Sequence, residues 1–241
     1  MEKSIAALMI GRGGSSLKNK NILPVHGKPL LLWAAAAAHR SRYINRYYIS
    51  SDCEQILSTA ETAGYKAIRR PDELAADTAQ SCDSVRHALS VMEQEDGPVD
   101  IIVVQHANVG TITEQIIDSC IEELLADETL SSVVPCHENS EYHPFRAKSR
   151  NEESLLEPFV SMEGNVSANR QDLPTAYFFD HSIWALRKSA VAGKGGQKPW
   201  DCMGSRIKPF VTEGCFDVHS LEDIKKTEKW IDENKIPSPS F

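Results

Sequence analysis

Ile5-Ala-Ala-Leu-Met-Ile10 is followed directly by Gly11-Arg-Gly-Gly14 near the start of the chain. The apolar run predicts a short buried strand, and the glycines predict a loop where that strand ends. The next apolar segment, Pro29–His39, has a proline in its first turn and a run of alanines, which predicts a helix. The chain therefore opens with a strand, a glycine-rich loop and a helix.

The same alternation continues through the first half of the chain. Its clearest strand is Asp100–Gln105, where two isoleucines and two valines follow one another. We expect further strands at 47–50, 66–68 and 131–135, and further helices at 53–63, 81–94 and 113–126. This order predicts an α/β fold with a mostly parallel, Rossmann-like sheet and helices on both of its faces.

The second half of the chain breaks this rhythm. Glu138–Val160 is polar and charged, so we expect an excursion from the sheet, a small inserted lobe or dimer arm at about 138–175. The aromatic segment Tyr177–Leu186 predicts a return to the sheet as one strand, and Leu221–Glu233 predicts a closing amphipathic helix. We interpret residues 1–241 as a single domain that carries this insertion.

Composition excludes several classes of protein. The chain has 241 residues, of which 41% are hydrophobic and 25% charged, as in an ordinary folded domain and unlike disordered, collagen-like or coiled-coil chains. Its net charge of −8 argues against a nucleic-acid partner. Apolar runs are too short to cross a bilayer or to form a secretion signal, so we expect a cytoplasmic protein without a membrane partner.

The cysteines are widely separated in the sequence. Their spacing fits neither a zinc knuckle nor a dithiol redox motif. In a reducing cytoplasm we expect them to be buried free thiols.

The glycine-rich loop is locally basic in an acidic chain. Gly11–Lys28 contains four basic residues, Arg12, Lys18, Lys20 and Lys28, and no acidic residue. Glycines allow a close backbone approach to an anion, and arginine and lysine neutralise phosphate charge, so the loop predicts a triphosphate site. A flexible, solvated turn remains an alternative. The pattern lacks the Gly-Lys-Ser/Thr of a Walker loop, and Ser16 replaces the third glycine of the dinucleotide fingerprint.

Three motifs resemble one enzyme family. They are Arg12-Gly-Gly-Ser15 with Lys20-Asn21 and Gly27-Lys-Pro-Leu30, then Ile49-Ser-Ser-Asp52, and most specifically Arg70-Pro-Asp-Glu-Leu-Ala-Ala-Asp-Thr78. In combination they resemble the acylneuraminate cytidylyltransferases, which make CMP-sialic acid and related nucleotide sugars. The resemblance covers most of the chain. It implies a homodimeric enzyme of the nucleotide-diphospho-sugar transferase fold, with its nucleotide pocket at the strand ends.

The resemblance also implies roles for individual residues. Arg12, Gly13, Gly14, Ser15 and Lys20 are expected to hold the triphosphate, with Asn21 beside the nucleotide. The base is expected to contact Arg70, Ala79, Ser81 and Gln105, although a satisfied amide at the strand end is an alternative for Gln105. The sugar acid is expected to contact Arg146 and Arg170, of which Arg170 matches the family arginine for the carboxylate.

The sequence departs from the family at positions that choose the substrate. After the central strand, Gln105-His-Ala-Asn-Val-Gly-Thr111 lacks the usual arginine. In the aromatic segment Phe178 and Asp180 replace a common arginine and asparagine, with His181 beside them, and we expect Asp180 and His181 to face the sugar. The family's terminal Asp-x-Asp is here Asp217-Val-His219. We expect Asp217, with His219, to hold Mg²⁺, with Mn²⁺ as an alternative because histidine is a poor magnesium ligand.

The resemblance implies transfer of CMP from CTP to the anomeric hydroxyl of an acidic ketosugar, with release of pyrophosphate. Arg12, Lys20 and Asp217 are the expected catalytic residues, because this chemistry needs positioning and charge neutralisation. Transfer from GTP and a nucleotide-binding sensor without catalysis remain alternatives. A glycosyltransferase is less favoured because 103–111 has no Asp-x-Asp, and a nicotinamide oxidoreductase because the fingerprint fails.

Overall fold

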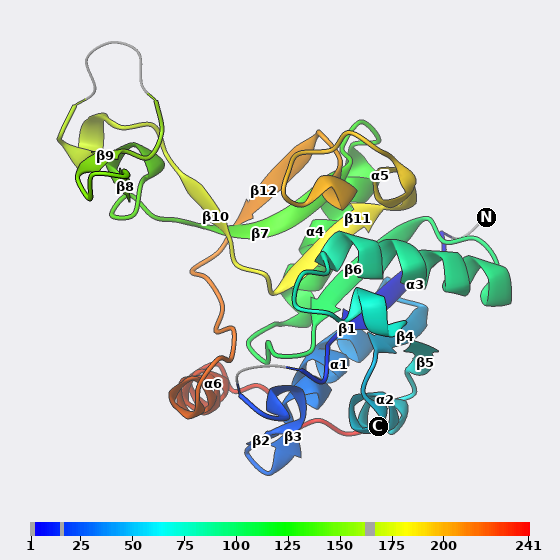
Figure 1. The fold of residues 1–241 in the computed structure, drawn as a ribbon. Helices are drawn as coiled ribbons and strands as arrows, with labels where there is room; N and C mark the ends of the chain where they lie inside the picture. Colours follow the sequence, from blue (N-terminus) through cyan, green and yellow to red (C-terminus); the bar gives the residue numbers. More distant parts are fainter. Residues whose placement is uncertain (1–2, 15–16, 162–166) are drawn as a thin grey trace.

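The computed structural model describes residues 3–14, 17–161 and 167–241. Within these residues the main sheet has eight strands, and seven of them follow the order β10-β7-β11-β6-β1-β4-β5, with β12 paired to β7 (Figure 1). The strands are β1 (Ile5–Ile10), β4 (Arg46–Ser51), β5 (Lys66–Arg69), β6 (Ile101–His106), β7 (Ser132–Glu138), β10 (Tyr177–Phe179), β11 (Ile183–Arg187) and β12 (Ile207–Val211).

Parallel pairing dominates one half of the sheet. β5, β4, β1 and β6 are parallel neighbours, and β12 runs parallel to β7. β11 is antiparallel to both β6 and β7, and β10 is antiparallel to β7. The predicted α/β fold is confirmed, and its antiparallel strands lie beyond the last strand of the regular alternation.

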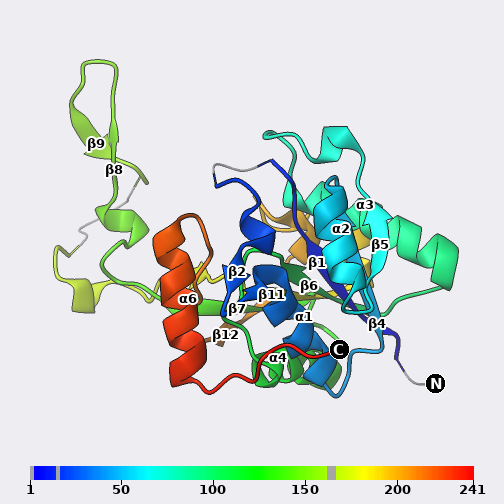
Figure 2. The same cartoon turned by 90° about the horizontal axis from the view of Figure 1, so that it is seen from below.

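Helices cover both faces of the sheet (Figures 1 and 2). One face packs against α1 (Leu30–Arg40), α2 (Glu54–Glu61) and α4 (Glu114–Ala126), and the other against α3 (Ser81–Asp96) and α5 (Lys188–Ala192). The burial of β1 between two layers of helices explains why its sequence is apolar throughout. Ala7 and Met9 enter the first core, while Leu8 and Ile10 enter the second, so both faces of the strand are buried.

A third apolar cluster attaches the C-terminal helix. α6 (Leu221–Glu233) contributes Ile224 and Ile231, which pack with Leu30, Trp33 and Val25. Val25 lies in the short hairpin of β2 (Pro24–Val25) and β3 (Lys28–Pro29). Ser220 and Asp223 form a capping box that fixes the start of α6.

The polar segment 139–176 projects from the sheet between β7 and β10 (Figure 1). It carries the hairpin β8 (Lys148–Arg150) and β9 (Leu156–Pro158), with the short 3-10 helices η3 (Pro144–Arg146) and η4 (Arg170–Asp172). We call it the lobe. Several of its large apolar side chains are exposed, among them Tyr142 at 72%, Leu156 at 74% and Phe159 at 69%.

The aromatic segment does not form the single predicted strand. It divides into β10 and β11 at Asp180-His181-Ser182. His181 has a φ of 54°, in the left-handed region, and the Asp180 carboxylate accepts hydrogen bonds from the Ser182 amide (2.9 Å) and hydroxyl (2.7 Å). This closed turn ends one strand before the next begins.

The expectation of free thiols is wrong for one pair of cysteines. Cys82, in the first turn of α3, is disulfide-bonded to Cys202 in the 3-10 helix η5 (Asp201–Met203). These residues are 120 positions apart, but the fold brings their Cα atoms to 5.4 Å, so sequence spacing could not exclude the bond. Cys53, Cys120, Cys136 and Cys215 are free. No helix in the described part of the chain has the length and apolarity needed to span a membrane.

Two glycines allow a matched test of packing beside η5. Gly204 (φ 77°, ψ −162°) and Gly97 (φ 84°, ψ −177°) share a backbone region open almost only to glycine, and a side chain there costs about 1–3 kcal/mol. A Cβ on Gly204 would lie 2.5 Å from Cβ of Ser131, whereas one on Gly97 would meet no described atom within 4 Å.

We therefore expect Gly204→Ala to lower the free energy of unfolding by roughly 1–3 kcal/mol more than Gly97→Ala. Urea denaturation of both variants measures this difference. Equal losses would contradict the packing of Gly204 against Ser131.

Candidate active site

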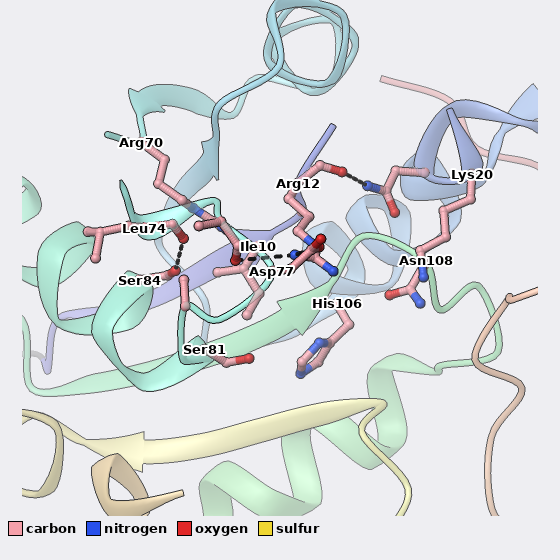
Figure 3. Close-up of a pocket in the computed structure, with 14 residues that line it drawn as sticks. Ile10, Arg12, Lys20, Arg70, Leu74, Asp77, Ser81, Ser84, His106 and Asn108 are labelled. Atoms are coloured by element: carbon pink, nitrogen blue, oxygen red, sulfur yellow. Dashed lines mark hydrogen bonds and ion pairs between the residues drawn. The ribbon is translucent and has the colours of Figure 1, made fainter. Parts of the chain in front are cut away.

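A cavity of about 260 Å³ lies where several parallel strands end (Figure 3). Its walls come from the ends of β1 and β6, the loop after β5, the start of α3 and the 3-10 helix η1 (Lys20–Ile22). Ligands of open α/β sheets bind at such carboxyl ends. The lining residues are Ile10, Gly11, Arg12, Lys20, Asn21, Arg70, Leu74, Ala76, Asp77, Ala79, Ser81, Ser84, His106 and Asn108.

The glycine-rich loop is held close to its neighbours. A Cβ on Gly11 would lie 2.8 Å from Cβ of Ala107, and one on Gly13 would lie 2.9 Å from Cβ of Cys53. The Gly13 amide donates to Asp52 (2.9 Å), so in this structure it is engaged within the protein. Gly14 is exposed and does not line the cavity. Ser15 lies outside the described residues.

Arg12 and Lys20 place positive charge at one end of the cavity. Nη1 of Arg12 lies 2.8 Å from the Asp77 carboxylate, and the side-chain amide of Asn21 donates to the Arg12 carbonyl (3.1 Å). Lys20 is half-buried. Burial lowers the pKa of its ammonium, Asp217 opposes this effect, and Arg12 adds to it. Both predicted phosphate-binding side chains therefore lie at one cavity, and buried Asn21 also supports the loop.

Arg70 lies at the other end of the cavity (Figure 3). It is buried, and its guanidinium donates to the Ser50 hydroxyl (3.2 Å) and carbonyl (2.8 Å). Burial lowers its pKa to about 10, so it stays charged at neutral pH. Ala79 and Ser81 also line this end. The Ser84 hydroxyl donates to the Leu74 carbonyl (3.2 Å) and so holds the loop between β5 and α3 in place.

The structure corrects the prediction for Gln105. Its side chain is fully buried on the opposite face of β6, where it accepts from the Tyr65 hydroxyl (2.8 Å) and donates to the Ala34 carbonyl (2.7 Å). Successive residues of a strand face opposite ways, so His106 faces the cavity instead. Because side chains alternate between the two faces of a strand, the position of His106 next to Gln105 in β6 was a signal in the sequence that could have identified it.

His106 and Asn108 are two polar residues of the cavity that sequence reasoning missed. The His106 ring packs edge-on against Trp184, with ring centroids 4.7 Å apart. Burial, and then His181 and Lys20, lower its pKa to about 3, so this imidazole is neutral at physiological pH. The side-chain amide of Asn108 donates to the Asp217 carboxylate.

Asp217 and His219 reach the same edge of the sheet. An isolated bridge pairs Asp217 with Val109, and the Val218 amide donates to the Asn108 carbonyl (3.1 Å). Nε2 of His219 lies 3.0 Å from the Asp217 carboxylate. The described residues contain no group of three or more His, Cys, Asp or Glu side chains suited to a metal. One or two protein ligands nevertheless fit Mg²⁺, which usually takes its other ligands from water and phosphate.

The predicted sugar contacts are not all brought together. Asp180 is buried, and besides Ser182 it accepts from the Thr212 hydroxyl (2.7 Å), so it is a structural residue and the prediction that it faces the sugar is wrong. Arg146 and Arg170 are exposed on the lobe and do not line the cavity of their own chain.

His181 lines a second cavity of about 340 Å³ beside the first. Its ring centroid is 5.7 Å from that of His106, so the two imidazoles lie between the cavities. The other residues that line this second cavity are Tyr177, Phe178, Phe179, Gln197, Lys198, Trp200 and Ile207. We call it the aromatic cavity.

The position of Gln105 gives a direct test. Gln105→Leu leaves the buried Tyr65 hydroxyl without its partner, which costs about 1–3 kcal/mol, and it removes a second hydrogen bond from the Ala34 carbonyl, which lies within α1. We expect lower stability in urea denaturation but unchanged affinity for nucleoside triphosphate in calorimetric titration. A large loss of affinity with unchanged stability would contradict the assignment of Gln105 to the core.

Comparisons with known proteins identify the family of this chain. The family model described as cytidylyltransferase matches residues 6–194. The chain is 39% identical over 92 residues to an N-acylneuraminate cytidylyltransferase of Escherichia coli, covering 38% of this chain and 22% of that one. It is 27% identical over 168 residues to a pseudaminic acid cytidylyltransferase of Campylobacter jejuni, covering 69% of this chain and 71% of that one.

A solved structure shares the fold. The CMP:2-keto-3-deoxy-manno-octonic acid synthetase complexed with CTP superposes with a TM-score of 0.69 at 16% identity, covering 96% of this chain and all of that one. The resemblance to acylneuraminate cytidylyltransferases that the motifs indicated is confirmed. Because the family model matches well over half of the chain, the protein belongs to the cytidylyltransferase family.

Proposed function

We propose that this protein transfers CMP from CTP to the anomeric hydroxyl of an acidic sugar of the nonulosonic acid class, releasing pyrophosphate. The observation that carries the proposal is the cavity at the strand ends, where Arg12 and Lys20 face Arg70 along one trough. The names of the E. coli and C. jejuni relatives support both the nucleotide and the class of sugar.

The triphosphate lies at the Arg12 and Lys20 end in this proposal. The sugar oxygen attacks the α-phosphorus, and the bond to the pyrophosphate breaks. Arg12 and Lys20 then stabilise the negative charge that develops on the leaving group. Binding requires Arg12 to exchange its contact with Asp77, whose side chain is 94% exposed, for the phosphates.

The base lies at the end formed by Arg70, Ala79 and Ser81. Arg70 is held by Ser50 through two of its nitrogens, so its orientation is fixed before a ligand binds. A fixed donor at a buried wall is suited to reading the edge of a base. The cytidylyltransferase relatives favour cytosine over guanine.

Asp217, with His219, would hold Mg²⁺, or Mn²⁺ as the alternative ion, against the phosphates. A divalent ion there would supply charge that neutralises the phosphates. Asn108 orients the Asp217 carboxylate through its hydrogen bond, and the pairing of Asp217 with Val109 keeps that carboxylate at the end of β6.

The sugar carboxylate binds Arg170, with Arg146 nearby, across a homodimer. These arginines do not reach the cavity of their own chain, and they lie on a lobe whose apolar side chains are exposed. A second copy that covers the lobe would bury those side chains and bring the arginines to its own cavity. In this arrangement residues 1–241 form one domain, with the lobe as its dimer arm.

Two lysines in one loop test the phosphate site. Lys20 lines the cavity, whereas Lys18 is exposed and does not. We expect Arg12→Ala and Lys20→Ala each to lower kcat/KM for CTP by about 100-fold or more, because one lost contact to developing charge has that effect. Pyrophosphate release measures the rate, and thermal unfolding checks the fold.

Lys18→Ala is the matched control and should change kcat/KM by less than about threefold, since it removes a surface charge. A Lys20→Ala enzyme as active as the Lys18→Ala enzyme would contradict the proposed site.

Mixing two inactive variants tests the homodimer. If Arg170 serves the partner's cavity, a heterodimer of Lys20→Ala and Arg170→Ala chains contains one intact site. Random exchange of subunits should then restore up to about a quarter of wild-type turnover. Mixtures that stay as inactive as the separate variants would show that Arg170 does not act across an interface.

A further inference from the structure

His181 occupies the boundary between the two cavities. Its ring is 5.1 Å from that of Trp200 in the aromatic cavity and 5.7 Å from that of His106, which lines the nucleotide cavity. A group at this boundary would lie between a sugar in the aromatic cavity and the α-phosphate of a nucleotide in the first cavity. The sequence predicts only a contact between His181 and the sugar.

The backbone of His181 is held in a conformation that rarely suits a residue with a Cβ. Its φ is 54°, and a non-glycine residue in that region costs roughly 1–2 kcal/mol. Asp180, Ser182 and Thr212 hold the turn in place. A strained residue supported in this way is typical of functional sites.

The imidazole of His181 is free to react. It packs against aromatic rings but makes no hydrogen bond to any other residue in the described part of the chain. Burial lowers its pKa below the ordinary histidine value, while Asp217 and Asp180 partly oppose this. It is therefore largely neutral at neutral pH, and the two carboxylates stabilise it once it gains a proton.

Other charged or titratable groups lie near this imidazole. Lys198 lines the same aromatic cavity, and His106, itself neutral, separates His181 from Lys20. Among the charged groups, Asp217 and Asp180 raise the pKa of His181 against the effect of burial and so favour its protonated form.

We propose that His181 is the general base of the reaction, an assignment that rests on the proposed function. A ring nitrogen of His181 takes the proton of the sugar's anomeric hydroxyl as the oxygen forms its bond to the α-phosphorus. The bond between that phosphorus and the pyrophosphate oxygen breaks, and pyrophosphate leaves with the electron pair. The imidazolium then returns its proton to solvent.

The other histidines of the site are less suited to this task. His106 has its Nε2 atom buried without a described partner and is too weakly basic at a pKa of about 3. His219 has a side chain that is 64% exposed and already contacts Asp217, the expected metal ligand. His181 alone of these three lines the aromatic cavity.

Two substitutions separate the base from the backbone turn. Asparagine and glycine both tolerate the left-handed conformation, so His181→Asn and His181→Gly should fold. We expect each to lower kcat by about 100- to 10,000-fold, with little change in the KM for CTP. In wild type, kcat/KM for the sugar should rise with pH as His181 loses its proton and then level off. The acidic limb should be absent in His181→Asn.

Added imidazole provides a readout that a structural role would not move. It should raise the turnover of His181→Gly at least about tenfold by replacing the missing base, and it should not rescue Lys20→Ala. His26→Asn is the matched control, because His26 also has a positive φ of 45° and lines neither cavity. It should keep wild-type kcat and pH dependence.

Two results would overturn the assignment. One is a His181→Asn enzyme with wild-type kcat and an unchanged acidic limb. The other is a slow enzyme that keeps the limb and, as His181→Gly, ignores imidazole. Wild-type pyrophosphate release from CTP and a nine-carbon sugar acid is measured in the same series. Its absence would contradict the proposed function and the base together, whereas its presence with either result above would contradict only the base.

Discussion

The parallel pairing of β1 with β6 is the constraint on which the site depends. Its register sets Ile10 opposite His106, so both strands end at the same level. The loops that follow then approach so closely that Gly11 has no room for a Cβ beside Ala107. This contact brings the basic loop of Arg12 and Lys20 over Asn108, and hence over Asp217. Without that register the cationic loop and the carboxylate would not share one cavity.

The antiparallel side of the sheet supplies the other half of the site. β11 lies beside β6, and its preceding turn brings His181 to the same edge as His106. Asp180 ties that turn to Thr212, at the start of the segment that leads to Asp217. The Phe216 amide donates to the hydroxyl of Thr111 (2.9 Å) and fixes the end of this segment. The buried Asp180 carboxylate thus holds the turn of the candidate base, and the contact of Phe216 with Thr111 holds the segment of the expected metal ligand.

Local signals predicted the alternating half of the fold well, because buried parallel strands and amphipathic helices have distinct periods. Arg12, Lys20 and Arg70, which line the cavity, were predicted because each belongs to a short motif that can be recognised without knowledge of the fold.

Features that depend on contacts between distant segments were missed. The residues around Cys82 give no sign that it is bonded to Cys202. The sequence around Asp180 likewise does not show that its carboxylate accepts hydrogen bonds from Ser182 and Thr212. Gln105 was misplaced because the family pattern was followed instead of the alternation of β6. The positions of Asp217 and His181 in space depend on β11, β12 and the turns beside them. These elements lie beyond the regular alternation of strands and helices, so the sequence pattern did not predict their arrangement.

We propose above all that this protein joins a cytidine nucleotide to an acidic sugar. The most direct measurement is pyrophosphate release by the purified protein with each of the four nucleoside triphosphates and Mg²⁺, against a panel of eight- and nine-carbon ketosugar acids. The account predicts release with CTP that requires a sugar acid. Release with GTP alone, or nucleotide binding with no release from any pair, would contradict it.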